Sequence, residues 1–405
     1  MVSGWLDEFL AAHLDELVEL RHHLHAHPEL SHVEHRTTEL LCARLLRAGL
    51  DPAVLSTGTG LLCGIGTGGG PVVALRADID ALGMDDTKQV PYRSTVPGVA
   101  HGCGHDFHTT VVLGVGLALA SRVGVEGALP FRHGVGVRLI FEPAEESVPG
   151  GAVTVIEDGG LEGVDAIFGF HADPRIDVGS VGVRTGALTA AADVVEIELA
   201  GPGGHTARPQ LTVDLVALAA RVAHELPRRV AARAGEGSQL GVVFGALQAG
   251  HAPNVIPTRA VLRGSVRTPD QTLWADAEGI VRSTLHELLD GSGARVRLAY
   301  QRGVPPVVNT AAEADLVRAA ATAALGRDAV VEPPRSNGGD SFAWYQQLVP
   351  GCYARLGVHD PTVSATRLDL HSGDFDVDDR AIDVGVRVMV ATVELLAARV
   401  GDRVD

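Results

Sequence analysis

PVVALRADID, at residues 71–80, is an apolar run that ends in two acids, and it begins the pattern that decides the fold class. A short apolar run of this kind is typical of a strand that is buried on both faces. Residues 106–123 then predict a helix, and residues 135–146 and 164–174 predict further strands with a helix between them. Because strands and helices alternate, we predict an α/β fold with a mostly parallel sheet sandwiched by helices.

The pattern changes near residue 184. Residues 193–204, DVVEIELAGPGG, alternate apolar and polar side chains, as a strand does when one face of its sheet is open. The segment that follows predicts the order β-α-β-β-α-β, which is typical of a split-βαβ, ferredoxin-like α+β domain. We therefore predict one α/β domain formed by residues 1–183 and 304–405, interrupted by an inserted α+β domain at residues 184–303.

The composition of the 405-residue chain argues against several classes of partner. Its formal net charge is -17 and it has no basic run, so nucleic acid and anionic membranes are poor candidates. Its four cysteines form no CxxC pair, which favours a reducing compartment over a disulfide framework. The N-terminal segment predicts an acidic amphipathic helix instead of a signal peptide, and no apolar run has transmembrane length. We expect a soluble cytoplasmic protein.

Polar side chains collect where the predicted strands end. These residues are Asp78, Asp80, Glu145, Glu146 and His171. In a doubly wound sheet, ligands bind beyond the carboxyl ends of the strands, so these side chains are expected to converge on one site. His371, in the stretch LDLHSGDF, follows a later strand by a loop and is a further candidate.

HGCGHDFH, at residues 101–108, places Cys103 between two glycines directly before a predicted helix. A lone cysteine is most often an incidental buried thiol, and a thiol nucleophile with a histidine base is a second interpretation. Neither accounts for the paired glutamates or for the histidines at the strand ends. Cys, His and Glu without local pair spacing indicate a catalytic rather than a structural metal centre. Two adjacent metals are a familiar arrangement for amide hydrolysis.

Six motifs occur in a fixed order: HGCGHDFHTT, FEPAEE, GFHADP, GPGGHTARP, NVIPTRAVLRGSVRT and LDLHSGDF. Together they resemble the dinuclear-metal aminoacylase and carboxypeptidase family, in its amidohydrolase branch of hippurate hydrolases, auxin-conjugate hydrolases and N-acyl-amino-acid deacylases. RHHLHAHPELSHVE and VALRADIDAL match as well, so the resemblance covers nearly the whole chain. It implies a metallopeptidase-like catalytic domain at 1–183 and 304–405 and a lid or dimerisation domain at 184–303.

The resemblance also implies a role for individual residues. The site would hold two divalent metal ions per subunit, zinc or manganese, with cobalt or nickel as alternatives. Its metal ligands would be Cys103, His105, Glu146, His171 and His371. Glu145 would be the general base and Asp80 a support for the ligands, while His205 would stabilise the oxyanion, in some relatives from the partner subunit. Substrate contacts would come from Asn254, Arg267 and Gly339, with Arg267 on a carboxylate.

The implied reaction is hydrolysis of the amide bond of N-acetyl, N-benzoyl or longer N-acyl amino acids, or of related conjugates, by a metal-activated water. A metallo-dipeptidase or carboxypeptidase of the same family is the alternative. A non-catalytic binding protein that keeps the fold is more remote, because neither Glu145 nor a ligand is lost. The implied partners are a small-molecule substrate and a second copy of the chain, joined through the inserted domain.

The chain departs from the family pattern at several positions. Glu142 stands where Gln is common, and Gly83 and Gly373 stand where Pro is usual. In the late loop, Asp340 and Ser341 replace Glu and Asp. None of these changes removes a proposed ligand or the base. The late-loop changes would lie close to the substrate, so they bear on its identity more than on activity.

The densest histidine run, RHHLHAHPELSHVEH at residues 21–35, is not predicted to bind metal. It lies in a predicted helix and turn, away from the strand ends. The family's ligands do not come from this segment either. We therefore predict a solvated or structural role for these histidines.

Overall fold

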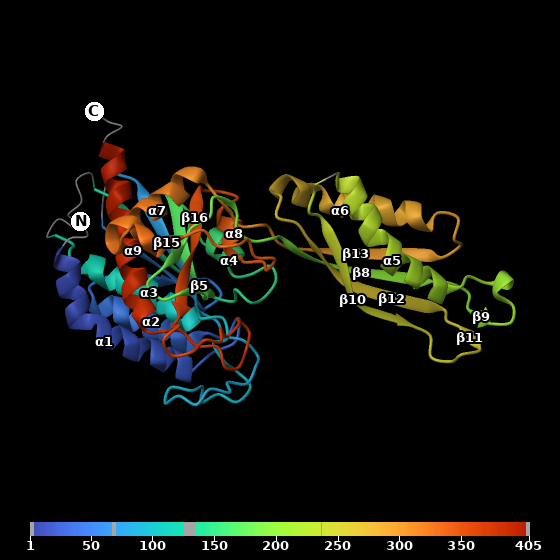
Figure 1. Cartoon of the computed structure of the whole chain (residues 1–405), viewed down its shortest axis with the longest axis horizontal. Helices are drawn as coiled ribbons and strands as arrows, with labels where there is room; N and C mark the ends of the chain where they lie inside the picture. Colours follow the sequence, from blue (N-terminus) through green and yellow to red (C-terminus); the bar gives the residue numbers. More distant parts are fainter. Residues whose placement is uncertain (1–3, 67–69, 125–128, 130–133, 236, 402–405) are drawn as a thin grey trace. The chain divides into compact units, whose positions relative to one another are not determined.

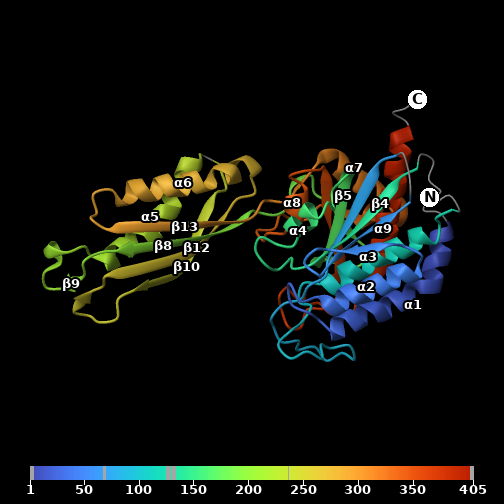
Figure 2. The same ribbon diagram turned by 180° about the vertical axis from the view of Figure 1, so that it is seen from behind.

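The computed structural model describes residues 4–66, 70–124, 129, 134–235 and 237–401. The chain divides into two compact units. Unit 1 comprises residues 1–186, 308–334 and 344–405, and unit 2 comprises residues 187–307 and 335–343. Figures 1 and 2 show the elements of each unit from opposite sides.

Unit 1 is built on an eight-stranded sheet with the order β1-β2-β4-β3-β5-β16-β6-β15. In that order the strands are Pro52–Val54, Leu61–Ile65, Gly136–Glu142, Val72–Asp78, Val164–Asp177, Gly351–His359, Val181–Gly182 and Val330–Val331. The four central strands β4, β3, β5 and β16 run parallel, whereas β2 joins β4 antiparallel. The mostly parallel sheet expected from the alternating pattern is therefore confirmed.

Helices cover this sheet, and its main apolar core lies on one face. The helices of unit 1 are α1 (Gly4–Ala26), α2 (His35–Arg47), α3 (His105–Ala120), α4 (Ala152–Glu157), α7 (Ala311–Leu325) and α9 (Arg380–Gly401). Apolar side chains of α1, α3, α7 and α9 pack with alternate residues of the central strands in one core. Figures 1 and 2 show α3 and α9 on one side of the sheet and α4 on the other.

The opposite face of the central strands is polar. Arg76 and Asp78 of β3, His171 of β5, and Tyr353 and Arg355 of β16 alternate with residues that belong to the apolar core. All of these polar side chains are buried. Period-two alternation on a sheet covered on both faces thus gives one apolar and one polar interior.

Unit 2 is a four-stranded antiparallel sheet with two helices packed on one face. The strand order is β10-β12-β8-β13, with β8 at Ala192–Ala200, β10 at Gly241–Ala249, β12 at Arg259–Arg267 and β13 at Arg295–Val304. Helices α5 (Leu215–Ala234) and α6 (Gln271–Leu289) follow β8 and β12 and bury their apolar sides against the sheet. The chain order β8-α5-β10-β12-α6-β13 is the predicted split βαβ arrangement. A small pair, β9 (Gly204–His205) and β11 (Val255–Ile256), completes the unit.

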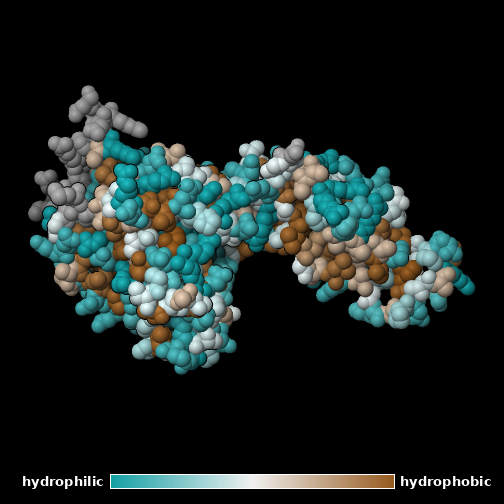
Figure 3. All heavy atoms as spheres, in the orientation of Figure 1, coloured by the Kyte–Doolittle hydropathy of each residue, from teal (hydrophilic) through white to brown (hydrophobic). Residues whose placement is uncertain are grey.

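The alternation of β8 has the expected structural consequence. Val195 and Ile197 are fully buried beneath the helices, while Glu196 and Glu198 on the open face pair with arginines of β12 and β13. Figure 3 shows apolar surface over the strands of this unit as well. Val243 and Val296 are among its exposed apolar residues.

The bounds of unit 2 differ from those of the predicted insertion at 184–303. Unit 2 begins at residue 187 and includes residues 335–343, which the sequence pattern placed in the larger domain. Backbone hydrogen bonds join this late segment to the start of the unit, from Ser336 to Leu188 and from Ala190 to Gly338. Such contacts between distant segments leave no local pattern in the sequence. Within the described ranges, no helix is both long and apolar enough to cross a membrane.

Candidate metal centre

The loop before α3 places Cys103 and His105 at the polar end of the central strands. Gly104 between them adopts a left-handed conformation, with φ of 83°. A β-carbon at this position would lie 3.1 Å from the Cβ of Ala172, which follows His171 on β5. Glycine therefore permits both the turn and the close approach of the loop to β5.

The structure brings all five predicted metal ligands and Glu145 into one cluster. Cys103 Sγ lies 3.5 Å from His171 Nε2, and His371 Nε2 lies 3.4 Å from a carboxylate oxygen of Glu146. His105 Nε2 lies 3.8 Å from Glu146 and 3.9 Å from Glu145. Two triads share Glu146, and in each the potential ligand atoms lie within 4.8 Å of one another: Cys103, Glu146 and His371, and His105, Glu145 and Glu146.

Two atoms of this cluster fit a bound cation particularly well. His105 Nε2 and Glu146 Oε1 are both buried, and neither has a hydrogen-bond partner among the residues that the structure describes, although Glu146 Oε1 lies within ion-pair distance of His371 Nε2, at 3.4 Å. Burying polar atoms without partners is costly, so such atoms usually serve a ligand. A divalent ion between the imidazole nitrogen and the carboxylate oxygen would satisfy both atoms. The donor set of thiol, imidazole and carboxylate suits zinc, manganese and similar metals.

Asp80 orients this side of the cluster. One of its carboxylate oxygens accepts from His105 Nδ1 at 3.2 Å, which leaves Nε2 directed into the cluster. The other oxygen accepts from Ser31 Oγ at 2.7 Å and from the backbone N–H of Glu146 at 3.0 Å. Asp80 thus holds both a histidine and the glutamate loop, as expected of a residue that supports metal ligands.

The electrostatics of Cys103 and His171 also suit a metal. Burial lowers the pKa of His171, the positive charge of Arg355 lowers it further, and the ring therefore stays neutral. Its Nδ1 donates to the carbonyl of Ala172 at 2.7 Å, so Nε2 keeps its lone pair towards Cys103. Burial raises the pKa of the Cys103 thiol. A thiolate at this position therefore requires a cation against it.

His371 reaches the cluster from a strained loop. Its φ is 58°, and its backbone N–H donates to the carbonyl of Gly102 at 2.7 Å. Its interaction with Glu146 raises the pKa of the imidazole. Left-handed backbone at a residue other than glycine is uncommon and often marks a functional position.

His108 lies beside the cluster but is not free to bind metal, although Asp78, His105 and His108 form a third compact triad. Its Nδ1 donates to Asp78 at 2.6 Å, and its Nε2 accepts from the backbone N–H of Ala172 at 2.8 Å. Both ring nitrogens are therefore used in positioning β5 beside His171. The spacing of three residues from His105, on one face of α3, is the sequence signal for this neighbour.

Glu142, one of the departures from the family pattern, lies in a buried ionic network behind the cluster. Arg76 donates from Nε to Glu142 at 2.6 Å and from Nη1 to Asp78 at 2.6 Å. The Tyr345 hydroxyl donates to Glu142 at 2.9 Å. Glu142 thus contributes a charge that Arg76 can neutralise.

The histidine run at 21–35 contributes support and no ligand to this cluster. His25 is buried between Asp106, at 2.8 Å, and Asp86, at 3.2 Å. Arg21 is also buried and donates to the same Asp106 at 3.1 Å. Because Asp106 directly follows His105 in the first turn of α3, these contacts anchor that turn to α1.

Unit 2 carries the other predicted site residues in two separate places. His205 and Asn254 are neighbours, since Val255 pairs with His205 and the Thr206 N–H donates to the Asn254 carbonyl at 3.3 Å. Arg267 lies at the far end of β12, where it donates to the Asn337 carbonyl at 2.6 Å, close in sequence to Gly339. At about 3.3 Å per residue, the length of β12 separates the two groups by about 26 Å.

Comparison with known proteins agrees with this geometry. The family model described as peptidase family M20/M25/M40 matches residues 74–395. A Rhodococcus jostii (strain RHA1) protein named "Putative glutamate--cysteine ligase 2-3" is 44% identical over 389 residues, covering 94% of this chain, which spans only 47% of that relative. The N-acetyl-L-cysteine deacetylase of Bacillus subtilis (strain 168) is 34% identical over 368 residues, covering 91% of this chain and 85% of the relative.

Among solved structures, a dinuclear metal-binding peptidase of the M20 family from Bacillus subtilis superimposes with a TM-score of 0.82 at 31% identity. The match covers 96% of this chain and 99% of that structure. The order of motifs, the fold and the family model therefore agree over most of the sequence. The chain belongs to peptidase family M20/M25/M40.

Proposed function

We propose that this chain is a metal-dependent amidohydrolase that cleaves N-acyl amino acids or related amino-acid conjugates. The observation that carries the proposal is the pair of triads that share Glu146, because two adjacent ion sites joined by one carboxylate are suited to amide hydrolysis. The ligands would be Cys103, His105, Glu146, His171 and His371. The relative named N-acetyl-L-cysteine deacetylase supports this class of substrate. So does an Arabidopsis thaliana relative named IAA-amino acid hydrolase ILR1-like 4, which is 32% identical over 376 residues, covering 92% of this chain and 83% of the relative.

The residues of the cluster can divide the chemistry between them. Bound divalent ions would make a water molecule acidic near neutral pH and would polarise the substrate carbonyl. Glu145 lies within the cluster and is proposed to accept the proton of that water and deliver it to the leaving amine. Asp80 accepts from His105 Nδ1, which would keep Nε2 available to hold a metal ion. His205 would donate to the oxygen that becomes negative.

The separation within unit 2 bears on how the site is completed. The oxyanion and the carboxylate of an N-acyl amino acid lie only a few ångströms apart, whereas β12 separates His205 from Arg267 by about 26 Å. The two residues of one unit 2 cannot contact the same substrate. If both act as proposed, one of them comes from a second copy of the chain, which supports a homodimer.

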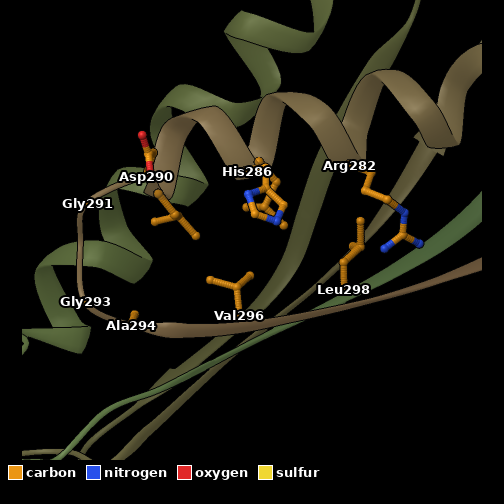
Figure 4. A pocket seen from close by; sticks show the side chains of 10 residues that line it. Arg282, His286, Asp290, Gly291, Gly293, Ala294, Val296 and Leu298 are labelled. Carbon is orange, nitrogen blue, oxygen red and sulfur yellow. The ribbon is translucent and has the colours of Figure 1, made fainter.

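The edge of unit 2 offers a surface for such a dimer. No other strand of the described chain pairs with the outer edge of β13. Beside it, a groove of about 430 Å³ lies between α6 and β13 and is lined by Leu285, Leu289, Val296 and Leu298 (Figure 4). Val296 is 41% exposed. We propose that this edge joins the two copies, because unpaired strand edges and exposed apolar side chains favour association.

Two further proposals concern the metal and the compartment. Zinc or manganese are proposed as the ions, with cobalt or nickel as alternatives, because thiolate, imidazole and carboxylate together accept all of them. A cytoplasmic location is proposed because all four cysteines are free, which fits a reducing compartment.

The test of the activity is a hydrolysis panel. Protein stripped with a chelator and restored separately with manganese, zinc, cobalt or nickel would be assayed on N-acetyl-L-cysteine, other N-acetyl, N-benzoyl and longer N-acyl amino acids, and dipeptides. Metal-dependent release of amine that Glu145→Gln lacks is the expected result. Activity that survives both chelation and Glu145→Gln would contradict the proposal, and preference for dipeptides would favour the peptidase alternative.

A further inference from the structure

Arg355 is a buried cation to which no acid bonds directly, although the charge of Arg355 lowers the pKa of the nearby Asp173. Its side chain lies in β16 and is only 6% exposed. No residue in the described part of the chain forms a hydrogen bond or ion pair with its guanidinium. The ring of Tyr353 lies beside it, with the ring centroid 5.7 Å from the guanidinium carbon. An aromatic face attracts a cation, but it offers no hydrogen-bond acceptor to the N–H groups that lie in the plane of the guanidinium.

The acid closest along the sheet is already engaged. Asp173 follows His171 by two residues on β5, and both of its carboxylate oxygens bind Arg175, at 2.7 and 2.9 Å. One of these oxygens also accepts from the Arg175 backbone N–H at 2.9 Å. Arg355 therefore remains without an acceptor beside an acid that is committed elsewhere. A buried charge without a partner is unfavourable, and proteins commonly retain one where a ligand completes it.

The position of Arg355 identifies where such a ligand would lie. β16 runs parallel to β5, and Arg355 pairs in register with His171. Both side chains lie on the polar face, since Ala354 and Leu356 point into the apolar core on the other face. The Tyr353 ring contacts both neighbours, with its centroid 6.1 Å from that of His171. The free guanidinium is therefore adjacent to a ligand of the candidate metal centre.

We propose that Arg355 binds the carboxylate of the substrate next to the scissile amide. The inference rests on the proposed function, because an N-acyl amino acid carries its carboxylate on the carbon bonded to the amide nitrogen. A guanidinium presents paired N–H groups that match the two oxygens of a carboxylate, which an ammonium group does not. Arg267 was the residue expected for this role. One of its N–H groups donates to the Asn337 carbonyl, and we assign the carboxylate next to the amide to Arg355, which leaves Arg267 to contact another part of the substrate.

The proposal makes Arg355 a determinant of specificity. A substrate with a free carboxylate gains an ionic contact beside His171, and the corresponding carboxamide leaves the guanidinium without an anion. The carboxylate that Arg355 binds could belong to the amino-acid half of the substrate or to an acidic acyl half. N-acetyl amino acids carry a carboxylate only on the amino-acid half, and N-succinyl amino-acid amides carry one only on the acyl half, so comparing the binding of the two compounds distinguishes these sources.

The test compares binding of N-acetyl-L-methionine with that of N-acetyl-L-methioninamide by calorimetry. Both would be titrated into manganese-loaded Glu145→Gln protein, which is expected to bind without turnover, and then into the same protein carrying Arg355→Met or Arg355→Lys. We expect the acid to bind about tenfold more tightly than the amide when Arg355 is present. Arg355→Met should abolish that preference, and Arg355→Lys should restore part of it. Arg318→Met, which removes a surface arginine paired with Asp315, is the matched control.

Two controls separate the subsite from a structural role. The metal content and the cobalt-thiolate absorption of Arg355→Met should equal those of its parent, since no ligand is changed. Its melting temperature should not fall, because the substitution removes an unpaired buried charge. The proposal would be overturned if Arg355→Met weakened binding of the acid and of the amide equally, or if it lowered the melting temperature and lost metal. It would also be overturned if the Glu145→Gln parent, which keeps Arg355, bound the acid no more tightly than the amide. A chain that hydrolyses nothing in the panel but shows the Arg355-dependent preference would contradict only the proposed function.

Discussion

Replacement of Arg76 tests how the polar interior behind the metal centre is held together. Arg76 is almost completely buried and donates to Asp78 and Glu142, each at 2.6 Å, while both carboxylates are fully buried. Arg76→Met keeps much of the side-chain volume but leaves the two acids without this cation. Removing one partner from a buried ion pair costs about 3–5 kcal/mol. At about 2–4 °C per kcal/mol for a large domain, the melting temperature should fall by about 6–20 °C.

Glu142→Gln provides the matched comparison. Alone it should cost less, because Arg76 keeps Asp78 and the glutamine oxygen can still accept from Tyr345. The double variant Arg76→Met/Glu142→Gln contains only one of the two carboxylates that Arg76→Met leaves unpaired. About half of the stability that Arg76→Met loses should therefore return. Scanning calorimetry of the four proteins measures this directly. A fall below about 2 °C for Arg76→Met, or a double variant no more stable than the single one, would refute the reasoning.

Three further outcomes are expected. Asp80→Asn should weaken metal binding about 10- to 100-fold, measured by competition with a chromogenic chelator, because the carboxylate no longer orients His105; unchanged affinity would contradict its supporting role. Burial opposes the charged form of His25, but Asp106 and Asp86 raise its pKa in the folded protein. The charged imidazole therefore stabilises the fold at pH 6, and this contribution is lost as the pH rises through the raised pKa of His25. The difference in melting temperature between the parent and His25→Gln should therefore be larger at pH 6 than at pH 9, and an equal difference would refute the assignment. Val296→Lys should halve the mass measured by light scattering if β13 joins two copies, whereas Val243→Lys on another strand should leave it unchanged.

Much of the fold and of the metal centre could be predicted because both follow local rules. Apolar runs that alternate with helices specify a parallel sheet, and parallel strands bring their carboxyl ends to one edge. Residues near the carboxyl ends of these strands, such as Glu146 in the loop after β4 and His171 within β5, therefore converge wherever the strands are neighbours. The distances around Cys103 bear out that expectation of convergence, while the roles of the residues rest on the experiments above.

Contacts that depend on packing between distant segments could not be predicted. His25 and Asp106 are 81 residues apart, and nothing in the histidine run indicates which acid it meets. The late segment 335–343 joins unit 2 through backbone hydrogen bonds, which have no side-chain signature. The wide separation of His205 from Arg267 likewise follows from the length and direction of β12 and not from either motif.

Arg76 and Arg355 together show why burial alone does not reveal a binding residue. Both guanidinium carbons lie near the Tyr353 ring, at 6.0 and 5.7 Å from its centroid, on the same polar face of the sheet. In the sequence both are arginines within apolar strands, VALRAD and CYARLGV, but Asp78 stands two residues after Arg76 and no acid stands at that spacing from Arg355. The fold surrounds Arg76 with Asp78 and Glu142, as a structural cation requires, whereas the acid near Arg355, Asp173, is bonded to Arg175. Since the same interior supplies partners for one arginine and none for the other, the missing anion at Arg355 is best explained by a ligand that arrives with the substrate.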